Sequence, residues 1–208
     1  MNFLSKALAA AGLATLSLAA SAATNILSTE WSWISTNGWM GTLRAGSGWE
    51  TGASLASQAS IVDGTFLPES TQWNSGSWWW DADASVNSAP VVTVIALNDS
   101  YALNSFSVQA DDNDTYRIEY WDGAAWQLAW DVPVQPSWGL TTRTSGLLPS
   151  ITTNQLRFTA TGGDNFYAVA EIQAFGSITR AVPEPETYAL MLAGLAAVGF
   201  VARRKTQR

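Results

Sequence analysis

Hydrophobic and polar residues alternate along most of the chain between residues 24 and 180, with a period of two residues. This period places successive side chains on opposite faces of an extended strand, whereas a helix would show a period near 3.6. Gly, Asn, Asp and Pro interrupt the alternation at short intervals, as expected for turns between short strands. The pattern predicts an all-β domain, an antiparallel jelly-roll β-sandwich over residues 24–177 without a long helix.

The strands are expected where the alternation is clearest, with a hairpin at Asp122-Gly123, a dipeptide typical of tight β-turns. Residues 91–97 are almost continuously apolar, which favours a strand buried on both faces. The other expected strands are 31–33, 106–108, 116–120, 126–130, 156–160 and 166–175. We expect the core to contain Val94, Ile118, Trp126, Leu156 and Phe158.

The first 23 residues have the composition of a secretory signal peptide. One charged side chain, Lys6, precedes an apolar stretch of small residues from Ala7 to Ala20. Ala20-Ser21-Ala22 then fits the A-x-A cleavage pattern, with Ala22 or Ala23 as the last residue removed. Residues 1–23 are therefore set apart from the fold.

The C-terminal region contains a short motif, an apolar run and a basic cluster, in that order. The motif lies in an expected linker, residues 178–186, and the run lies in an expected hydrophobic helix with a basic tail, residues 187–208. Residues 188–202 form an apolar run of 15, short of the ~20 that span a bilayer, and the basic residues halt transfer across the membrane. The motif is Val182-Pro183-Glu184-Pro185, and the basic cluster is Arg203, Arg204 and Lys205.

This order of parts resembles the PEP-CTERM sorting signal of exported proteins in Gram-negative bacteria. The resemblance implies that an exosortase, a membrane enzyme, recognises the Pro-Glu-Pro motif and cuts off the tail. It also implies export across the inner membrane and contact with that membrane through the C-terminal helix before processing. The final location would be the cell surface, the outer envelope or the extracellular matrix. A hydrophobic C-terminus without the motif would be a plain membrane anchor.

Between residues 24 and 180 the chain contains five Arg, 15 Asp or Glu, and no Cys, His or Lys, so its formal charge is 5 − 15 = −10. Nucleic acid is excluded as a partner because affinity for phosphates rests on clustered Lys and Arg. The absence of His and Cys excludes zinc sites of the usual kind and Ser–His or Cys–His nucleophiles. Carboxylate chemistry and the binding of Ca²⁺ stay open. A simpler interpretation is that the charge keeps an exported protein soluble.

Three pairs of segments, in order and in register, resemble the galactose-binding-like domain of discoidin and of coagulation-factor C-type modules. The pairs are 59–65 with 71–75, 113–120 with 122–126, and 155–158 with 168–176. The resemblance implies a non-enzymatic module that binds glycans, phospholipid surfaces or proteins. It also implies one structural Ca²⁺, held by Asp63, Thr65 and Glu171.

The surroundings expected for Glu171 agree with this Ca²⁺ site. Glu171 lies within the apolar alternation of the last strand, where packing would leave its carboxylate poorly solvated. A cation that bridges Glu171 and Asp63 would remove this cost. The alternative is a half-exposed Glu171 with an Arg partner.

A tryptophan-rich segment supplies the candidate ligand contacts. All 12 Trp lie between residues 24 and 180, and three of them are consecutive, from Trp78 to Trp80. In an extended strand Trp78 and Trp80 point to one side and Trp79 to the other, so at least one indole is expected at the surface. A flat ring beside carboxylate and amide groups suits a sugar, which predicts a glycan site at Trp73, Trp78, Trp80 and Asp81. The alternatives are a core role with one exposed edge, or contact with a protein.

The sequence as a whole favours an exported protein whose β-sandwich binds glycan, with exopolysaccharide as the expected ligand. One alternative is a non-enzymatic structural or protein-interaction component of the extracellular matrix or biofilm, which a smooth polar surface would favour. Another is a glycoside hydrolase, which needs two carboxylates roughly 5–9.5 Å apart in a cleft, one of them with a raised pKa. The acidic stretch 111–114 is expected to be a solvated turn between two strands rather than a cation site, because it lacks the Gly and the distal Glu of an EF-hand.

Overall fold

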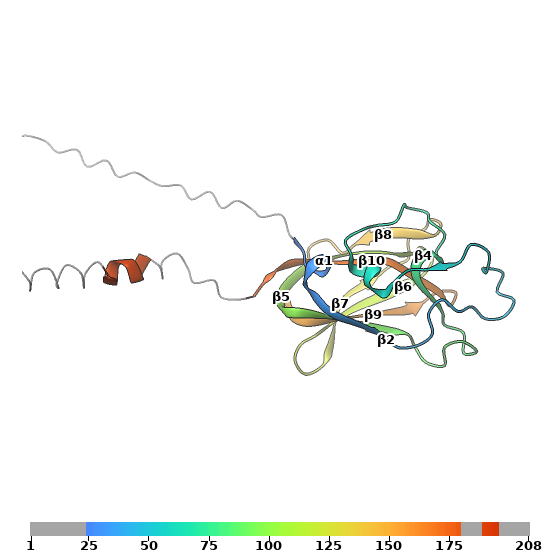
Figure 1. Ribbon diagram of the computed structural model, residues 1–208, viewed down its shortest axis with the longest axis horizontal. Coiled ribbons are helices and arrows are strands. Elements are labelled where there is room, and N and C mark those ends of the chain that lie inside the picture. The colour runs from blue at the N-terminus through green and yellow to red at the C-terminus, as the bar shows by residue number, and fades with distance from the viewer. Residues whose placement is uncertain (1–23, 180–188, 196–208) are drawn as a thin grey trace, which may run out of the picture.

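Residues 24–179 and 189–195 are described by the structure, a computed structural model, and residues 24–179 form ten strands and two short helices (Figure 1). In chain order the elements are β1 (Thr24–Asn25), α1 (Leu27–Glu30), β2 (Trp31–Thr36), β3 (Ser54–Leu55), η1 (Gln58–Val62), β4 (Ser75–Asp81), β5 (Val92–Asp111), β6 (Thr115–Trp121), β7 (Trp126–Val132), β8 (Leu140–Thr144), β9 (Ile151–Gly162) and β10 (Phe166–Ile178). Residues 189–195 are helical. The expected signal peptide, the motif at 182–185 and the basic cluster at 203–205 lie outside the described residues.

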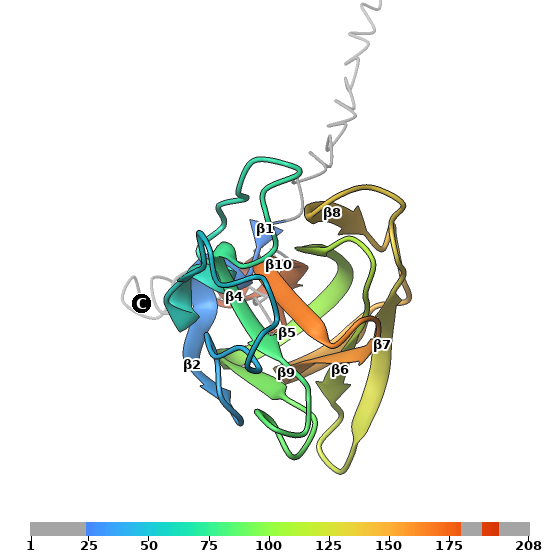
Figure 2. The ribbon, with the colours of Figure 1, turned by 90° about the vertical axis from the view of Figure 1, so that its right-hand side faces the viewer.

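One strand of 20 residues, β5, belongs to both layers of the sandwich. Residues 92–97 pair with β2 and β9, whereas the part that begins at Tyr101 pairs chiefly with β10 and β8. One layer therefore contains β2, β9, β6 and β7, and the other contains β8, β10, β4 and β3 (Figure 2). The sequence predicted two separate strands here, 91–97 and 106–108. That prediction is wrong, because β5 has ladder partners on both sides of an irregularity between Ala96 and Tyr101.

The predicted fold class is confirmed. All strand pairs are antiparallel except β3 with β4, and the two helices have four and five residues. The predicted hairpin is present: Asp122 Oδ1 accepts hydrogen bonds of 2.8 Å from the backbone N–H groups of Ala124 and Ala125, and Gly123 has a φ of 101°. The last strand ends at Ile178, one residue beyond the expected domain boundary.

The main hydrophobic cluster lies between the layers. It contains Ile118, Leu156 and Phe158, as predicted. Val94 and Trp126 are only half-buried, so their assignment to the core is wrong. Val94 points to the face of β5 opposite Ile95, and Trp126 belongs to β7, which lies at the end of the strand order. An edge strand is covered less completely, and Trp126 is covered by the Trp121 ring and the Arg157 guanidinium.

Strand β4 carries the three consecutive tryptophans, and both of its faces are covered. Trp78 and Trp80 contact the main cluster, and Trp79 belongs to a second, smaller cluster. The other buried members of the second cluster are Trp73, Leu140, Ala168 and Ala170. The predicted alternation is confirmed, but Trp79 and Trp80 are 3% and 2% exposed and Trp78 is half-buried. The core interpretation of the triplet is therefore the one that the structure supports.

The chain enters and leaves the sandwich at one end. Strand β1 pairs with the end of β10, with Thr24 opposite Gly176. The long connections between β2 and β3 and between β4 and β5 extend at the other end, on the right-hand side of Figure 1. We refer to this side as the loop end; it comprises residues 37–53, 82–91, 112–114, 133–139 and 163–165.

Candidate functional site

Three tryptophans on the connections of the loop end have exposed rings. Trp39 is 70% exposed, Trp138 is 56% exposed and Trp49 is 38% exposed. None of them belongs to a strand. Large apolar rings that stay exposed beside hollows and polar groups are characteristic of ligand-binding surfaces.

A charged pair fixes the connection that carries Trp39 and Trp49. The guanidinium of Arg44 donates two hydrogen bonds to the Asp81 carboxylate, Nε to Oδ2 at 2.8 Å and Nη2 to Oδ1 at 2.7 Å. The backbone N–H of Arg44 donates to Oδ2 as well, at 2.8 Å. Arg44 also lies 4.1 Å from the ring centroid of Phe166. Because Asp81 is fully buried, it positions Arg44 and cannot itself contact a ligand.

The first hollow of the loop end has a volume of about 430 Å³ and combines the exposed ring of Trp39 with Arg44. Its other lining residues are Thr42, Leu43, Ala45, Ser85 and Val86. Arg44 Nη1 lies 3.5 Å from Asp83 Oδ2, and the side chains of these two residues are 26% and 38% exposed. Hydrogen bonds from the hydroxyl and backbone N–H of Ser85 lower the pKa of Asp83, so this carboxylate is ionised at neutral pH.

Buried Asn87 holds the backbone of Trp39 in place beside this hollow. Asn87 Oδ1 accepts the Trp39 N–H at 2.7 Å, and Asn87 Nδ2 donates to the Trp39 carbonyl at 3.0 Å and to the Asp81 carbonyl at 2.8 Å. Gly38, just before Trp39, has a φ of 86°, and a Cβ there would lie 2.6 Å from Asn87 Oδ1. The exposed indole is thus attached to an ordered backbone rather than to a free loop.

The second hollow is smaller, about 130 Å³, and is walled by indoles and carboxylates. Its lining residues are Trp49, Trp73, Asp111, Asp112, Asn113, Trp138, Gly139 and Asp164. Trp73 is 5% exposed and meets Trp49 edge to face, with ring centroids 6.0 Å apart. The rings of Trp73 and Phe166 are 5.5 Å apart, and Phe166 lies under Arg44, so an aromatic row connects the two hollows.

The acidic stretch 111–114 is not the solvated turn that the sequence predicted. Asp111 is 4% exposed and Asp114 is fully buried. Burial raises the pKa of Asp114 to about 8 and that of Asp111 to about 7. A Cβ at Gly163, whose φ is 147°, would lie 1.7 Å from Asp114 Oδ1, so glycine there allows the close approach.

The hydrogen bonds of Tyr116 are consistent with a protonated Asp114. The Tyr116 hydroxyl lies 3.0 Å from both Asp114 Oδ2 and the Ala168 carbonyl oxygen, and it can donate to only one of them. It also accepts a hydrogen bond of 3.2 Å from the Ala168 N–H. If Asp114 is protonated, it donates to Tyr116 Oη and Tyr116 donates to the carbonyl, so every group is satisfied.

Arg143, which the sequence did not single out, lies beneath this acidic stretch. It is 5% exposed, and its guanidinium donates to backbone carbonyls, among them Ala110 O at 2.8 Å and Pro133 O at 3.3 Å. Burial lowers its pKa. Arg143 ties the strands behind the second hollow to one another, and the only sequence signal was its position within a polar strand.

The predicted Ca²⁺ residues are brought together at the 63–65 loop. Glu171 is fully buried; its Oε1 accepts the Gly64 N–H at 2.9 Å, and its Oε2 has no hydrogen-bond partner. Burial raises the pKa of Glu171 to about 8. Asp63 Oδ1 accepts the Thr65 N–H at 2.8 Å. The alternative, a half-exposed Glu171 paired with Arg, is wrong, since no described Arg pairs with it.

The predicted glycan contacts fare differently from one another. Asp81 is fully buried, so direct contact through its side chain is wrong. Trp73 and Trp80 are only 5% and 2% exposed, but Trp73 lines the second hollow and Trp80 lines another of about 340 Å³ beside residues 82–91, so their contact with glycan stays a prediction. The second cluster covers Trp73, whereas Trp80 on the opposite face of β4 packs in the main cluster. Trp78 is half-buried, and its Nε1 is enclosed without a hydrogen-bond partner. The exposed tryptophans of the loop end were missed because no strand pattern surrounds them.

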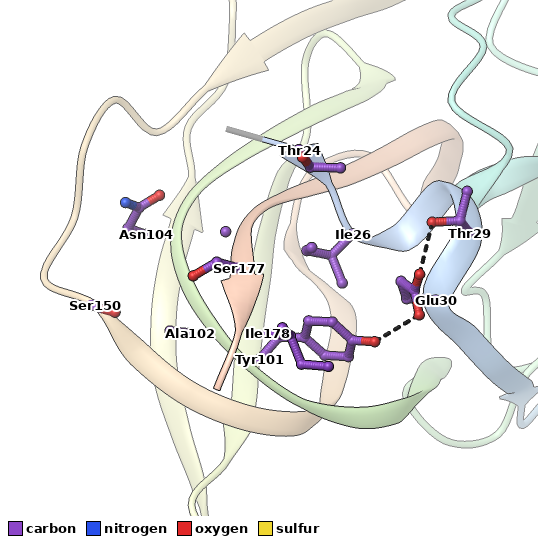
Figure 3. A pocket seen from close by; sticks show the side chains of 11 residues that line it. Thr24, Ile26, Thr29, Glu30, Tyr101, Ala102, Asn104, Ser150, Ser177 and Ile178 are labelled. Atoms are coloured by element: carbon purple, nitrogen blue, oxygen red, sulfur yellow. Dashed lines mark hydrogen bonds between the residues drawn. The ribbon is translucent and has the colours of Figure 1, made fainter. Parts of the chain in front are cut away.

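The hollow of about 580 Å³ at the opposite end differs in character (Figure 3). It lies where β1 meets the end of β10, and Tyr101, 3% exposed, donates a hydrogen bond of 2.7 Å to Glu30 Oε2. This bond lowers the pKa of Glu30. The hollow has no exposed aromatic ring among its lining residues, so the loop end is the better candidate for a glycan site.

Comparison with known proteins identifies the C-terminal signal. Residues 181–205 match the PEP-CTERM protein-sorting motif. The PEP-CTERM motif indicates export, with a surface or extracellular location, and implies processing by an exosortase. Among the described residues, no helix has the length and apolar character needed to cross a membrane. A search of curated protein sequences finds no match.

Solved structures share the fold of the β-sandwich. The C-terminal domain of a chitobiase from Bacteroides fragilis is 13% identical, with a TM-score of 0.51 over 76% of this chain and 100% of that one. A putative chitobiase fragment from Bacteroides thetaiotaomicron is 16% identical, with a TM-score of 0.51 over 80% and 100%. The family 32 carbohydrate-binding module of NanJ from C. perfringens, solved with galactose, is 16% identical, with a TM-score of 0.48 over 73% and 98%. The fold is an antiparallel jelly-roll β-sandwich.

Proposed function

We propose that this protein is an exported, exosortase-sorted surface or matrix component whose β-sandwich binds glycan, with exopolysaccharide as the ligand. The observation that carries the proposal is the exposed Trp39 ring beside the hollow that Arg44 lines. An indole covers the apolar C–H face of a sugar, while charged groups at the edge exchange hydrogen bonds with its hydroxyls. Arg44 donates and ionised Asp83 accepts, so both kinds of hydroxyl contact are available.

Preorganisation supports this site. Arg44 is held by buried Asp81, and Trp39 is held through Asn87, so little side-chain or loop entropy is lost on binding. The rival proposal, a scaffold without a ligand site, predicts a smooth polar surface. Two hollows with exposed rings argue against it.

Glycoside hydrolysis is less well supported. Of the three buried carboxylates with raised pKa values, Asp111, Asp114 and Glu171, only Asp111 lines one of the hollows described above. Asp114 is fully buried and bonded to Tyr116, so it cannot reach a glycosidic oxygen. Asp111 shares the second hollow with Asp112 and Asp164, but the volume of about 130 Å³ does not admit two sugar rings with the glycosidic bond between them.

The structural Ca²⁺ stays part of the proposal. An ionised Glu171 Oε2 without a donor is uncompensated, and a protonated one would lack an acceptor. A cation held by Glu171, Asp63 and oxygens of the 63–65 loop would satisfy it, with Ca²⁺ the preferred ion for such ligands. Among the described residues no group of three or more Asp, Glu, His or Cys side chains is arranged for a metal, so backbone carbonyls and water would complete the shell. The ion would stabilise the loop rather than contact glycan.

A glycan array tests the binding proposal. Exported protein, with and without Ca²⁺, is compared with Trp39→Ala and with Trp33→Ala, which removes an indole on β2 that is 48% exposed and lines neither loop-end hollow. We expect polysaccharide binding to fall at least about tenfold in the first variant and to stay unchanged in the second. Equal binding by all three proteins would refute the site at Trp39. Binding by none of them would refute the proposed function.

A further inference from the structure

We infer that the second hollow binds the ammonium group of an amino sugar, so that the glycan recognised at the loop end contains hexosamine residues with free amines. The inference deepens the proposed function and rests on it. The hollow is the one lined by Trp49, Trp138 and the carboxylates of Asp111, Asp112 and Asp164.

The walls of the hollow suit an organic cation. Trp49 and Trp138 are both exposed, and Trp73 closes the floor between them. The face of an indole carries negative potential, and a cation within about 6 Å of it gains roughly 0.5–2 kcal/mol. The same faces pack against the C–H groups of a sugar ring, which a purely polar hollow cannot do.

The carboxylates of the hollow give it negative charge, and no basic side chain lines it. Asp112 is partly exposed and Asp164 is exposed, and Asn113 Nδ2 donates to Asp164 Oδ2 at 3.1 Å. No Arg lines the hollow: Arg44 is paired with Asp81, and Arg143 donates to backbone carbonyls.

The carboxylate of Asp111 gives an independent indication of a missing partner. Asp111 lines the hollow although the residue is only 4% exposed. One oxygen accepts the Asp112 N–H at 3.1 Å, and the other accepts no hydrogen bond from the described residues. The free oxygen is not among the enclosed atoms without a partner, so it opens into the hollow, where an ammonium donor could form a charge-assisted hydrogen bond with it.

A metal ion fits this hollow less well than an ammonium group. Among residues 24–179 and 189–195, no three acidic, His or Cys side chains converge as a metal site requires. A divalent ion needs six or more oxygens at short distance, whereas an ammonium needs three acceptors and tolerates aromatic neighbours. The volume of about 130 Å³ admits the amine-bearing edge of one sugar residue and excludes a whole ring.

The neighbouring hollow would hold the next part of the same chain. The aromatic row Trp49, Trp73 and Phe166 leads from the second hollow to Arg44 at the first. A polysaccharide that spans the two hollows above this row would place a hydroxyl-rich residue at Arg44 and Asp83 and an amine at Asp111 and Asp112. The two hollows therefore divide the recognition of one ligand.

The test compares glucosamine oligomers with N-acetylglucosamine oligomers of equal length, by calorimetry at pH 7 and moderate salt, with the exported protein purified in detergent. We expect the free-amine oligomer to bind at least about tenfold more tightly. Asp112→Asn and Asp164→Asn should remove most of this preference and leave the acetylated oligomer unaffected. The matched control is Asp131→Asn, which removes an exposed carboxylate on β7 that pairs with Arg117 and lines neither hollow.

Each outcome decides the inference. Equal affinity for the two oligomers, or a preference that survives both hollow variants, would overturn the inference. The proposed function would still stand if Trp39→Ala weakened glycan binding. Binding of a lysine oligopeptide as tight as that of the glucosamine oligomer would overturn it in favour of a protein partner. If neither oligomer nor any array glycan binds, the proposed function fails with it. Melting curves of Asp112→Asn and Asp164→Asn that match the unaltered protein exclude a folding defect. The conservative Asp112→Glu variant keeps the charge and should retain the preference for the free amine.

Discussion

The carboxylate of Asp81 and the guanidinium of Arg44 form a two-point ion pair, with hydrogen bonds of 2.8 and 2.7 Å, in which the acid is fully buried and the base is 26% exposed on its side chain. Such a pair fixes direction as well as distance, because the planar guanidinium matches the carboxylate. The pair links the end of β4 to the long connection before β3. It therefore joins a core residue to the proposed binding surface.

The first prediction concerns this pair. Asp81→Ala should lower the free energy of unfolding by about 2–4 kcal/mol, since it removes the buried partner of the Arg44 guanidinium. It also leaves the backbone N–H of Arg44 without its acceptor. Asp131→Ala removes the acid of an exposed pair with Arg117 and should cost under ~1 kcal/mol. Urea titration measures both. Equal losses in the two variants would show that burial of Asp81 does not matter.

The second prediction separates core from surface tryptophans. Trp73→Ala removes a buried ring of the second cluster and should cost about 3–5 kcal/mol in stability. Trp39→Ala removes an exposed ring and should change stability by less than ~1 kcal/mol while it weakens glycan binding. Thermal melts and array binding, measured on the same preparations, give both quantities. A stable Trp73→Ala protein with normal melting would contradict the core assignment.

The third prediction concerns pH. Asp114 has a folded pKa of about 8 against an ordinary value of 3.8, so the folded protein retains a proton that the unfolded chain releases above pH ~4. This contribution to stability is fully present below pH ~4 and is lost as the pH rises toward 8. Asp111 and metal-free Glu171 act in the same direction. The melting temperature in chelator should therefore be higher at pH 5 than at pH 8, and Asp114→Asn should flatten the dependence. A melting temperature that rises over this range would contradict the buried, protonated acid.

The fourth prediction concerns Ca²⁺. A cation that binds only the folded state adds RT ln(1 + [L]/Kd), or about 2.7 kcal/mol at a hundredfold excess over Kd. Ca²⁺ should raise the melting temperature of the unaltered protein and do much less for Glu171→Ala, in which the buried carboxylate is missing. Bound Ca²⁺ should also remove the share of the pH dependence that Glu171 contributes. If chelator leaves the melting curve unmoved, the metal proposal is wrong and the fold assignment is unaffected.

The fifth prediction concerns the tail. Replacement of Pro183-Glu184-Pro185 by three alanines should leave the protein uncut and retained in the membrane fraction, because the motif within the matched 181–205 segment would be lost. Gel mobility and cell fractionation report both effects. A control with Ala replacing Thr179, which lies before the segment, should be processed normally. Normal processing of the triple variant would contradict recognition through Pro-Glu-Pro.

The fold could be predicted because its signals are local. Alternation marks β6, β9 and β10, and Asp122-Gly123 marks the hairpin. Neither signal depends on the tertiary contacts of these segments. The length of β5 could not be predicted, since Asn98-Asp99 has the composition of a turn. The strand continues through it because β9 and β10 pair with the residues that flank it.

The candidate site was harder to predict because burial is a tertiary property. The same indole at Trp73 would be exposed or buried depending on whether Leu140 and Ala168 cover it, and these lie far along the chain. Likewise, Asp81 was noticed for its carboxylate, but its partner Arg44 comes from another connection, 37 residues earlier. The loop end did carry one usable signal, Trp39 and Trp49 in a glycine-rich segment where no core strand was expected.

The pairing of β1 with the end of β10 has a mechanical consequence. The tail leaves the sandwich from the end of β10, whereas a polysaccharide held at the loop end would pull on the connections 37–53 and 82–91, which join β2, β4 and β5. A pull between the two would run along β10, parallel to its ladder with β5, which extends from Val169 opposite Ala110 to Ile178 opposite Tyr101. Inter-strand hydrogen bonds lie perpendicular to the strands, so this load shears many of them together instead of opening them one at a time. Under the proposed function, tension between a retained tail and a bound polysaccharide would therefore meet the ladders of β10 in their resistant direction.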